Sequence, residues 1–156
     1  MTDDGLVLDT RGGECTAMPS HPSIRLWDDS REALIDEDTA IAPAVQFTSK
    51  ARLFAGRNIA FCDQPRPLRR VYFLGTGEQS APAFDRVSPS EALIELARHS
   101  FLLDVEERQM LAAHFDELAD LAKLRVFYKL DYPRNYEDLA GVRNAIEKHC
   151  KQMDEP

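Results

Sequence analysis

The sequence lacks an apolar run that approaches the ~20 residues needed to span a membrane. Its amino terminus has neither the basic nor the apolar region of a secretory signal peptide. Basic residues are outnumbered: 19 Lys and Arg stand against 27 Asp and Glu, which gives a net charge of -8. Only Arg66, Arg69 and Arg70 are loosely clustered, so the phosphate backbone of a nucleic acid would meet little positive charge. These absences argue against membrane and nucleic-acid partners and predict a cytoplasmic protein.

Cysteine is scarce, and its spacing excludes the common metal sites. Cys15, Cys62 and Cys150 are odd in number and far apart, so we expect reduced thiols in a cytoplasmic protein. The adjacent pair His149-Cys150 is the one place that suggests zinc, but it lacks further His ligands close by in the sequence. Glycine is also sparse. None of the seven glycines is followed by Lys-Ser or Lys-Thr, so Gly75-Thr76-Gly77 is not a phosphate loop.

The remaining composition is that of a globular domain. Hydrophobic residues make up 44% and charged residues 29% of the 156 residues, enough for one sizeable core. We expect a single domain over residues 1–150 and a frayed tail over 151–156. The fold class predicted is mixed α/β, with short strands and a hairpin in the amino-terminal half and three helices in the carboxyl-terminal half.

Short strands are expected first. Leu6-Val7-Leu8 is uninterrupted by polar residues and predicts a strand buried on both faces. The pair Gly12-Gly13 is typical of a two-residue hairpin turn. Further along, the patterns predict a returning strand at 15–19, an extended segment at 21–27 and a short helix after a cap at 28–30. A long loop at 36–48 and a strand at 50–55 follow.

The second half begins with an apolar run, Val71–Leu74, that predicts a central strand. Additional strands are expected at 83–87 and 126–130. Ser88-Pro89-Ser90-Glu91 combines a cap, a proline in the first turn and a capping box, so a helix should begin there with the apolar stripe Leu93, Leu96, Ala97 and Phe101. Asp104 and Glu107 mark a second helix with the stripe Leu111, Phe115, Leu118 and Ala122. A third helix starts near Tyr136, with Leu139, Val142, Ile146 and Cys150 on one side.

Two groups of polar residues are candidates for chemistry. Asp3 and Asp4 precede the first apolar run, where two carboxylates could hold Mg²⁺ and accept a proton from a hydroxyl. They could equally be solvated turn or capping residues. Lys50 and Arg52 lie two apart on an expected strand and would share a face. Such a pair can bind phosphate, although an ordinary exposed polar face has the same pattern.

Several fragments occur in the order found in one family. They are Thr2-Asp3-Asp4 before Leu6-Val7-Leu8, Pro22-x-Ile24-Arg25-Leu26-Trp27, Lys50-x-Arg52-Leu53, Val71-Tyr72-Phe73-Leu74, Ser88-Pro89-x-Glu91-Ala92-Leu93 with His99-Ser100, Tyr132-Pro133, and Leu139-x-x-Val142. Through them the chain resembles the carboxyl-terminal part of HPr serine kinase-like proteins. The resemblance implies a partial fold of the phosphoenolpyruvate carboxykinase type.

The resemblance also implies roles and cofactors. Asp3 and Asp4 would contact Mg²⁺ and act as the base for an incoming hydroxyl, Lys50 and Arg52 would face phosphate, and ATP would be the donor. The family's phosphate loop precedes the Asp pair, and Met1 stands where the family has an apolar strand residue. We therefore expect one of two origins for Met1. Either the start codon has been assigned inside a longer reading frame, or the chain is a truncated relic of a longer protein. Phosphoryl transfer is expected only with a loop supplied by a longer product or a complementing amino-terminal piece.

Three functions remain open from the sequence. The first is this kinase-like fragment, the second is a non-catalytic protein-interaction module on the same scaffold, and the third is a hydrolase that uses Asp3, Asp4 and His21. In the family, strands from the preceding amino-terminal half belong to the same sheet. Their loss would leave the strand at Leu6–Leu8 uncovered. An apolar unpaired strand pairs readily with another chain, so self-association, as a dimer, is expected.

Overall fold

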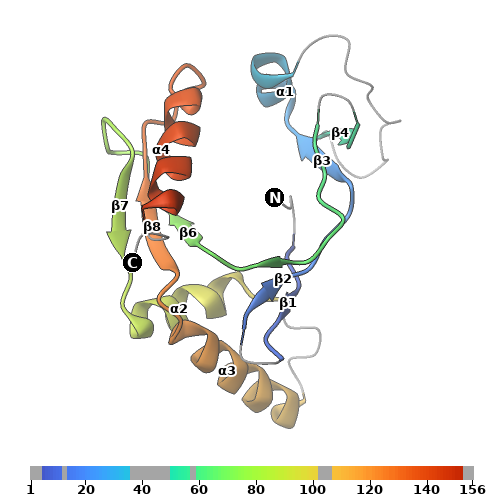
Figure 1. Cartoon of the computed structure of the whole chain (residues 1–156), viewed down its shortest axis with the longest axis vertical. Coiled ribbons are helices and arrows are strands. Elements are labelled where there is room, and N and C mark those ends of the chain that lie inside the picture. The colour runs from blue at the N-terminus through green and yellow to red at the C-terminus, as the bar shows by residue number, and fades with distance from the viewer. Residues whose placement is uncertain (1–4, 12–13, 36–49, 57–58, 102–106, 153–156) are drawn as a thin grey trace. The chain divides into compact units, whose positions relative to one another are not determined.

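The computed structural model describes residues 5–11, 14–35, 50–56, 59–101 and 107–152 (Figure 1). The chain divides into two compact units, Met1–Pro67 and Leu68–Pro156. The single domain expected over residues 1–150 stays a prediction. Among the described residues, no helix combines the length and apolarity that a membrane crossing requires.

The first unit contains a small antiparallel sheet of β1 (Leu8–Asp9), β2 (Thr16–Ala17) and β5 (Arg66–Pro67), in that order. The expected hairpin is confirmed, because Leu8 pairs with Ala17; its Gly12-Gly13 turn lies outside the described residues. The strand buried on both faces is wrong: Leu6 and Val7 are 47% and 69% exposed. An apolar run is buried only where other layers cover it, and two-residue strands offer few side chains to do so.

The first unit contains a second pair of strands, and this pair includes a core residue. β3 (Ser23–Leu26) pairs antiparallel with β4 (Ala51–Phe54), and Leu53 is fully buried. Both strands confirm the sequence-based expectation. The short helix α1 (Asp28–Leu34) is also confirmed, but its cap is not: Trp27 occupies the cap position without a side-chain hydrogen bond. The expected loop at 36–48 lies outside the described residues.

The second unit is built on a three-stranded sheet. β6 (Val71–Leu74) pairs parallel with β8 (Phe127–Asp131), and β7 (Ala83–Arg86) pairs antiparallel with the other side of β8. The order β6-β8-β7 corrects the expectation that Val71–Leu74 would be the central strand. Strand order depends on contacts distant in sequence, and Leu74 is 59% exposed at the sheet edge.

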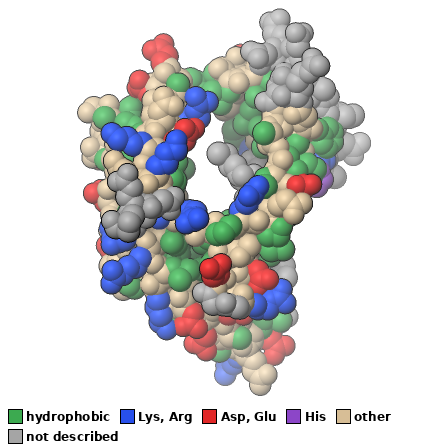
Figure 2. Space-filling view, in the orientation of Figure 1, with side chains coloured by type: hydrophobic (Ala, Val, Ile, Leu, Met, Phe, Trp, Pro, Cys, Tyr) green, Lys and Arg blue, Asp and Glu red, His purple; other side chains and the backbone are tan. Residues whose placement is uncertain are grey.

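Three helices complete this unit, as expected: α2 (Pro89–His99), α3 (Arg108–Ala122) and α4 (Leu139–Lys151). The capping box of α2 is confirmed, since the Ser88 hydroxyl accepts from the Glu91 amide and the Glu91 carboxylate accepts from the Ser88 amide. Glu107 occupies the cap position of α3 without a side-chain hydrogen bond, and Asp104 lies outside the described residues. Figure 2 shows acidic side chains gathered over α3 at the lower end of the view.

Helices cover both faces of this sheet. On one face, the Phe73 ring stacks on His99 of α2, and on the other the Phe84 ring stacks on His149 of α4. Some stripe residues are confirmed as core and others are not: Phe101 is 75% and Phe115 52% exposed. The buried residues of this unit are Ala92, Leu118, Leu121, Ala122, Phe127, Tyr128, Leu130 and Val142. The mixed α/β class is therefore confirmed.

Candidate functional site

The two candidate catalytic carboxylates, Asp3 and Asp4, lie outside the described residues. Their expected roles toward Mg²⁺ and a substrate hydroxyl stay predictions. Within the described residues, no group of three or more His, Cys, Asp or Glu side chains is placed to hold a metal ion. His149-Cys150 consequently has no third ligand of these types in that part of the chain.

The phosphate-binding candidates Lys50 and Arg52 lie on one face of the β3–β4 pair. Arg52 is opposite Arg25 in the register, and Leu26 is opposite Ala51. The next rung therefore brings Trp27 to Lys50, whose ammonium nitrogen is 5.2 Å from the centre of the indole ring. Because side chains alternate along a strand, these four side chains share a face and the buried Leu53 points to the other.

The surroundings of Arg52 are polar and aromatic. Its Nε donates to the Ser23 hydroxyl at 3.2 Å, and a terminal nitrogen lies 3.0 Å from Nε2 of His21. Its guanidinium group also lies 5.0 Å from the centre of the Phe54 ring. Like charges directly opposite each other on an antiparallel pair of strands repel. A bound anion would reduce this repulsion between Arg25 and Arg52.

We call this surface the β3–β4 face; it consists of His21, Ser23, Arg25, Trp27, Lys50, Arg52 and Phe54. Trp27 and Phe54 are 54% and 47% exposed, so a ligand with an aromatic part has rings to stack on. Sequence spacing identified the Lys50 and Arg52 pair. It could not identify Arg25 as a member, because that depends on the register between two strands with the segment 36–49 between them.

A second cluster of reactive side chains lies between β6 and α4. The Tyr72 hydroxyl is 2.8 Å from Nδ1 of His149 and 3.4 Å from Sγ of Cys150. The His149 ring stacks on Phe84 with 4.3 Å between ring centres and meets the edge of Tyr128 at 4.6 Å. No sequence pattern predicts this cluster, because Tyr72 and His149 are 77 positions apart.

Burial favours the neutral forms of His149 and Tyr72. Burial, followed by the positive charge of Arg70, lowers the pKa of His149. Burial is the largest cause that raises the pKa of Tyr72. The consistent arrangement is that the phenol donates to Nδ1 of a neutral His149 while its oxygen accepts from the Cys150 thiol. Protonating Nδ1 removes the acceptor on which the phenol depends.

Stability should fall as His149 is protonated. Its pKa is lower in the folded protein than the ordinary value of 6.5, so the unfolded chain binds the proton more readily. The contribution of His149 is then fully present above pH 6.5 and is lost as the pH falls through the folded-state pKa. We expect His149→Phe, which keeps a ring against Phe84, to show a weaker loss of stability than wild type between about pH 7.5 and 5.

Urea unfolding at several pH values measures this difference. Carboxylates contribute equally to both proteins, so the wild-type minus variant difference isolates the imidazole. Parallel curves for the two proteins would contradict a neutral His149 in the folded protein.

The Gly75-Thr76-Gly77 segment serves a structural purpose at the end of the sheet. The Asp131 carboxylate accepts from the amides of Gly77 at 2.6 Å and Tyr132 at 3.0 Å. Burial raises the pKa of Asp131, but these amides and that of Glu78 outweigh it and lower the pKa overall. Gly77 has a φ of 89°, which glycine adopts without strain.

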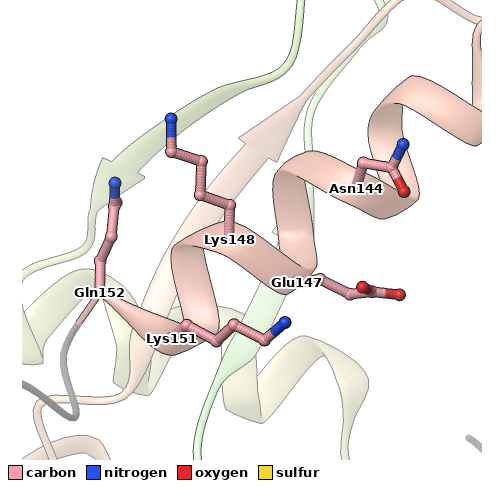
Figure 3. Close-up of a pocket in the computed structure, with 5 residues that line it drawn as sticks. All are labelled: Asn144, Glu147, Lys148, Lys151 and Gln152. Atoms are coloured by element: carbon pink, nitrogen blue, oxygen red, sulfur yellow. The ribbon is translucent and has the colours of Figure 1, made fainter.

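The described residues also contain an open pocket of about 450 Å³ at the end of α4. Figure 3 shows its lining, which comes from α4 and the residue that caps it: Asn144, Glu147, Lys148, Lys151 and Gln152. All five residues are exposed and polar. Ligand sites are usually concave and apolar with convergent polar groups, so this surface is an ordinary solvated helix face.

The exposed thiol is Cys62. The side chain of Arg66 donates to its sulfur at 3.3 Å, and this hydrogen bond lowers the pKa of the thiol. Cys15 and Cys150 are half-buried, and none of the three cysteines is in a disulfide.

Comparison of the chain with protein-family models, with curated proteins and with solved structures gives no match. Any functional assignment therefore depends on the chemistry of the residues and on the resemblance of the sequence fragments.

Proposed function

We propose that this chain is the carboxyl-terminal part of an HPr serine kinase-like phosphotransferase of the cytoplasm. It would take part in ATP-dependent phosphoryl transfer to a hydroxyl of a protein serine or a small molecule. The phosphate loop would come from a longer product or from a partner chain. The observation that carries the proposal is the β3–β4 register, which gathers Arg25, Lys50 and Arg52 on one face.

The register supports the family resemblance because it joins two of its fragments. Residues 22–27 and 50–53 resemble the family separately, and they form paired strands with Ile24 opposite Leu53. The fragments at 71–74 and 88–93 likewise coincide with β6 and the start of α2. Fragments that occupy regular elements are better candidates for a retained scaffold than fragments scattered in loops.

Each residue has a chemical role in the proposal. Arg25 and Arg52 would neutralise phosphate oxygens by charge-assisted hydrogen bonds, with Lys50 as an additional point charge. Trp27 would stack on an aromatic base. Asp3 and Asp4 offer the oxygen ligands that Mg²⁺ prefers, and one of them would accept the proton of the attacking hydroxyl. When bound, the metal would neutralise charge on the transferred phosphoryl group.

A specific observation favours one alternative. No glycine in the sequence is followed by Lys-Ser or Lys-Thr. Transition-state stabilisation in this chemistry comes mainly from such a loop and its metal. The alternative is therefore a non-catalytic interaction module that keeps the scaffold and binds a protein partner, including a second copy of the chain.

Pyrophosphate binding tests the β3–β4 face directly. We expect Arg52→Gln and Lys50→Gln together to weaken binding at least about tenfold, since hydrogen bonds to charged groups contribute about 1.5–3 kcal/mol. The measurement is a titration of the full chain followed by the side-chain NMR signals of His21, which lies 3.0 Å from Arg52. Arg11→Gln is the matched control, because Arg11 is a cation of the same unit already paired with Asp9.

Binding that is equal in wild type and in the double variant would contradict the proposed phosphate role. Phosphoryl transfer by the 156-residue chain alone would contradict the need for a supplied loop. Binding without any transfer, even after an amino-terminal piece is added, would favour the interaction module.

A further inference from the structure

We propose that Arg70 and Arg86 form an anion site in the second unit that takes a phosphate monoester or a similar tetrahedral dianion. The site is separate from the β3–β4 face and does not depend on the function proposed above. It lies at the end of the sheet where β6 and β8 begin and the antiparallel β7 ends.

The strand register brings the two arginines together. Tyr128 on the central strand is opposite Tyr72 on one side and Arg86 on the other. Arg70 precedes Tyr72 by two residues and so projects to the same face. The guanidinium carbons of Arg70 and Arg86 lie 5.3 and 5.8 Å from the centre of the Tyr128 ring. Both positive charges therefore lie within 5.8 Å of the centre of one buried ring.

Neither charge is neutralised by an acid within the described part of the chain. Arg70 donates to the carbonyl of Arg69 and Arg86 to that of Arg125, and Nε of Arg70 is buried without a hydrogen-bond partner. A buried donor without a partner is costly, and two like charges beside one ring add repulsion. A bound anion would offset the repulsion between the two charges.

The two carboxylates closest in sequence to Arg86 are engaged or face away. Glu91 accepts from both the amide and the hydroxyl of Ser88 at the start of α2. Asp85 is opposite Lys129 in the register, and both alternate to the other face of the sheet from Arg86 and Tyr128. Arg86 is exposed and can meet an anion from solution, whereas Arg70 is half-buried.

The geometry selects the class of anion. A planar carboxylate carries one charge and is best bound by one guanidinium in a two-pronged arrangement. Arg70 directly precedes β6, Arg86 is the last residue of β7, and together they carry two charges. A tetrahedral dianion has oxygens that point in several directions, so it can accept from both groups at once.

The test uses sulfate as the probe, because it remains a tetrahedral dianion across the pH range of a histidine titration. Sodium sulfate is added to the full chain at constant ionic strength, and the side-chain NMR signals of all four histidines are followed. We expect saturable shifts of the His149 signals and a rise in its pKa, because the bound dianion offsets the charge of Arg70 that lowers it. Inorganic phosphate at about pH 8 should compete with sulfate.

The variants distinguish sulfate binding at the arginine pair from a general effect of salt on all charges. Arg86→Gln and Arg70→Gln should each weaken sulfate binding at least about tenfold, whereas Arg143→Gln, on an exposed arginine of α4 paired with Glu147, should leave it unchanged. Arg70→Lys keeps the charge and most of the stem and should retain most of the binding. Its behaviour therefore distinguishes lost charge from lost packing.

Three results would overturn the proposal. They are an unchanged affinity in Arg86→Gln, an equal shift of His149 with acetate at the same ionic strength, and a linear, non-saturating response. The signals of His21 report on the β3–β4 face, and those of His149 report on the arginine pair. The two proposed anion sites can therefore be confirmed or contradicted independently.

Discussion

Replacing Phe127 with Ala is expected to lower the free energy of unfolding of the second unit by about 3–5 kcal/mol. Phe127 is 2% exposed and lies on β8, the central strand. Its ring stacks on Phe73 with 5.8 Å between centres and 8° between planes. Truncation removes the buried ring and leaves a cavity that the strands on either side cannot close without breaking their pairing. A domain stable by about 5–15 kcal/mol would lose much of its margin.

Urea unfolding followed by far-UV circular dichroism measures this loss, because three of the four described helices lie in the second unit. The fluorescence of Trp27, the single tryptophan, follows the first unit in the same samples. Phe115→Ala is the matched control: its ring is 52% exposed on α3, so we expect a change below about 1 kcal/mol. Equal losses for both variants would mean that Phe127 is not the centre of the core.

Local signals in the sequence were sufficient for most elements. The start of α2 follows from Ser88, Pro89 and Glu91 alone, because a capping box needs only residues three apart. The strands at 23–26 and 51–54 follow from alternation over a few residues. Burial and strand order are different, since they depend on what covers a segment. Leu6 and Val7 are as apolar as any core pair and are exposed, and the apolar run at 71–74 is an edge strand.

The candidate sites show the same difference between local patterns and contacts that are distant in sequence. The spacing of Lys50 and Arg52 placed them on one face, but Arg25 joins them only through the register of a strand more than twenty residues earlier. The Tyr72, His149 and Cys150 cluster combines residues from β6 and α4 that no motif links. Asp3 and Asp4, on which the sequence-based hypothesis depends, lie outside the described residues. The contacts between segments distant in sequence therefore could not be predicted from the sequence patterns.

Gly75 shows how a weak sequence signal acquires a physical meaning. A Cβ atom at this position would lie 2.6 Å from Cγ and 2.8 Å from Oδ1 of Asp131, closer than such atoms approach in proteins. The Asp131 side chain cannot move away freely, because its carboxylate holds the amides of Gly77 and Tyr132. We therefore expect Gly75→Ala to lower the free energy of unfolding by about 1–3 kcal/mol, through steric crowding and the loss of these hydrogen bonds.

The same substitution at Gly141 should have the opposite sign. Gly141 lies within α4 and is exposed, and a Cβ atom added there would meet nothing within 4 Å, so alanine gains helix propensity without a clash. We expect Gly141→Ala to raise the free energy of unfolding by about 0.5–1 kcal/mol. Both variants are compared with wild type in urea by circular dichroism. A neutral or stabilising Gly75→Ala would mean that Asp131 does not close the turn, whereas opposite signs at the two glycines would locate the constraint in the contact with Asp131 rather than in glycine itself.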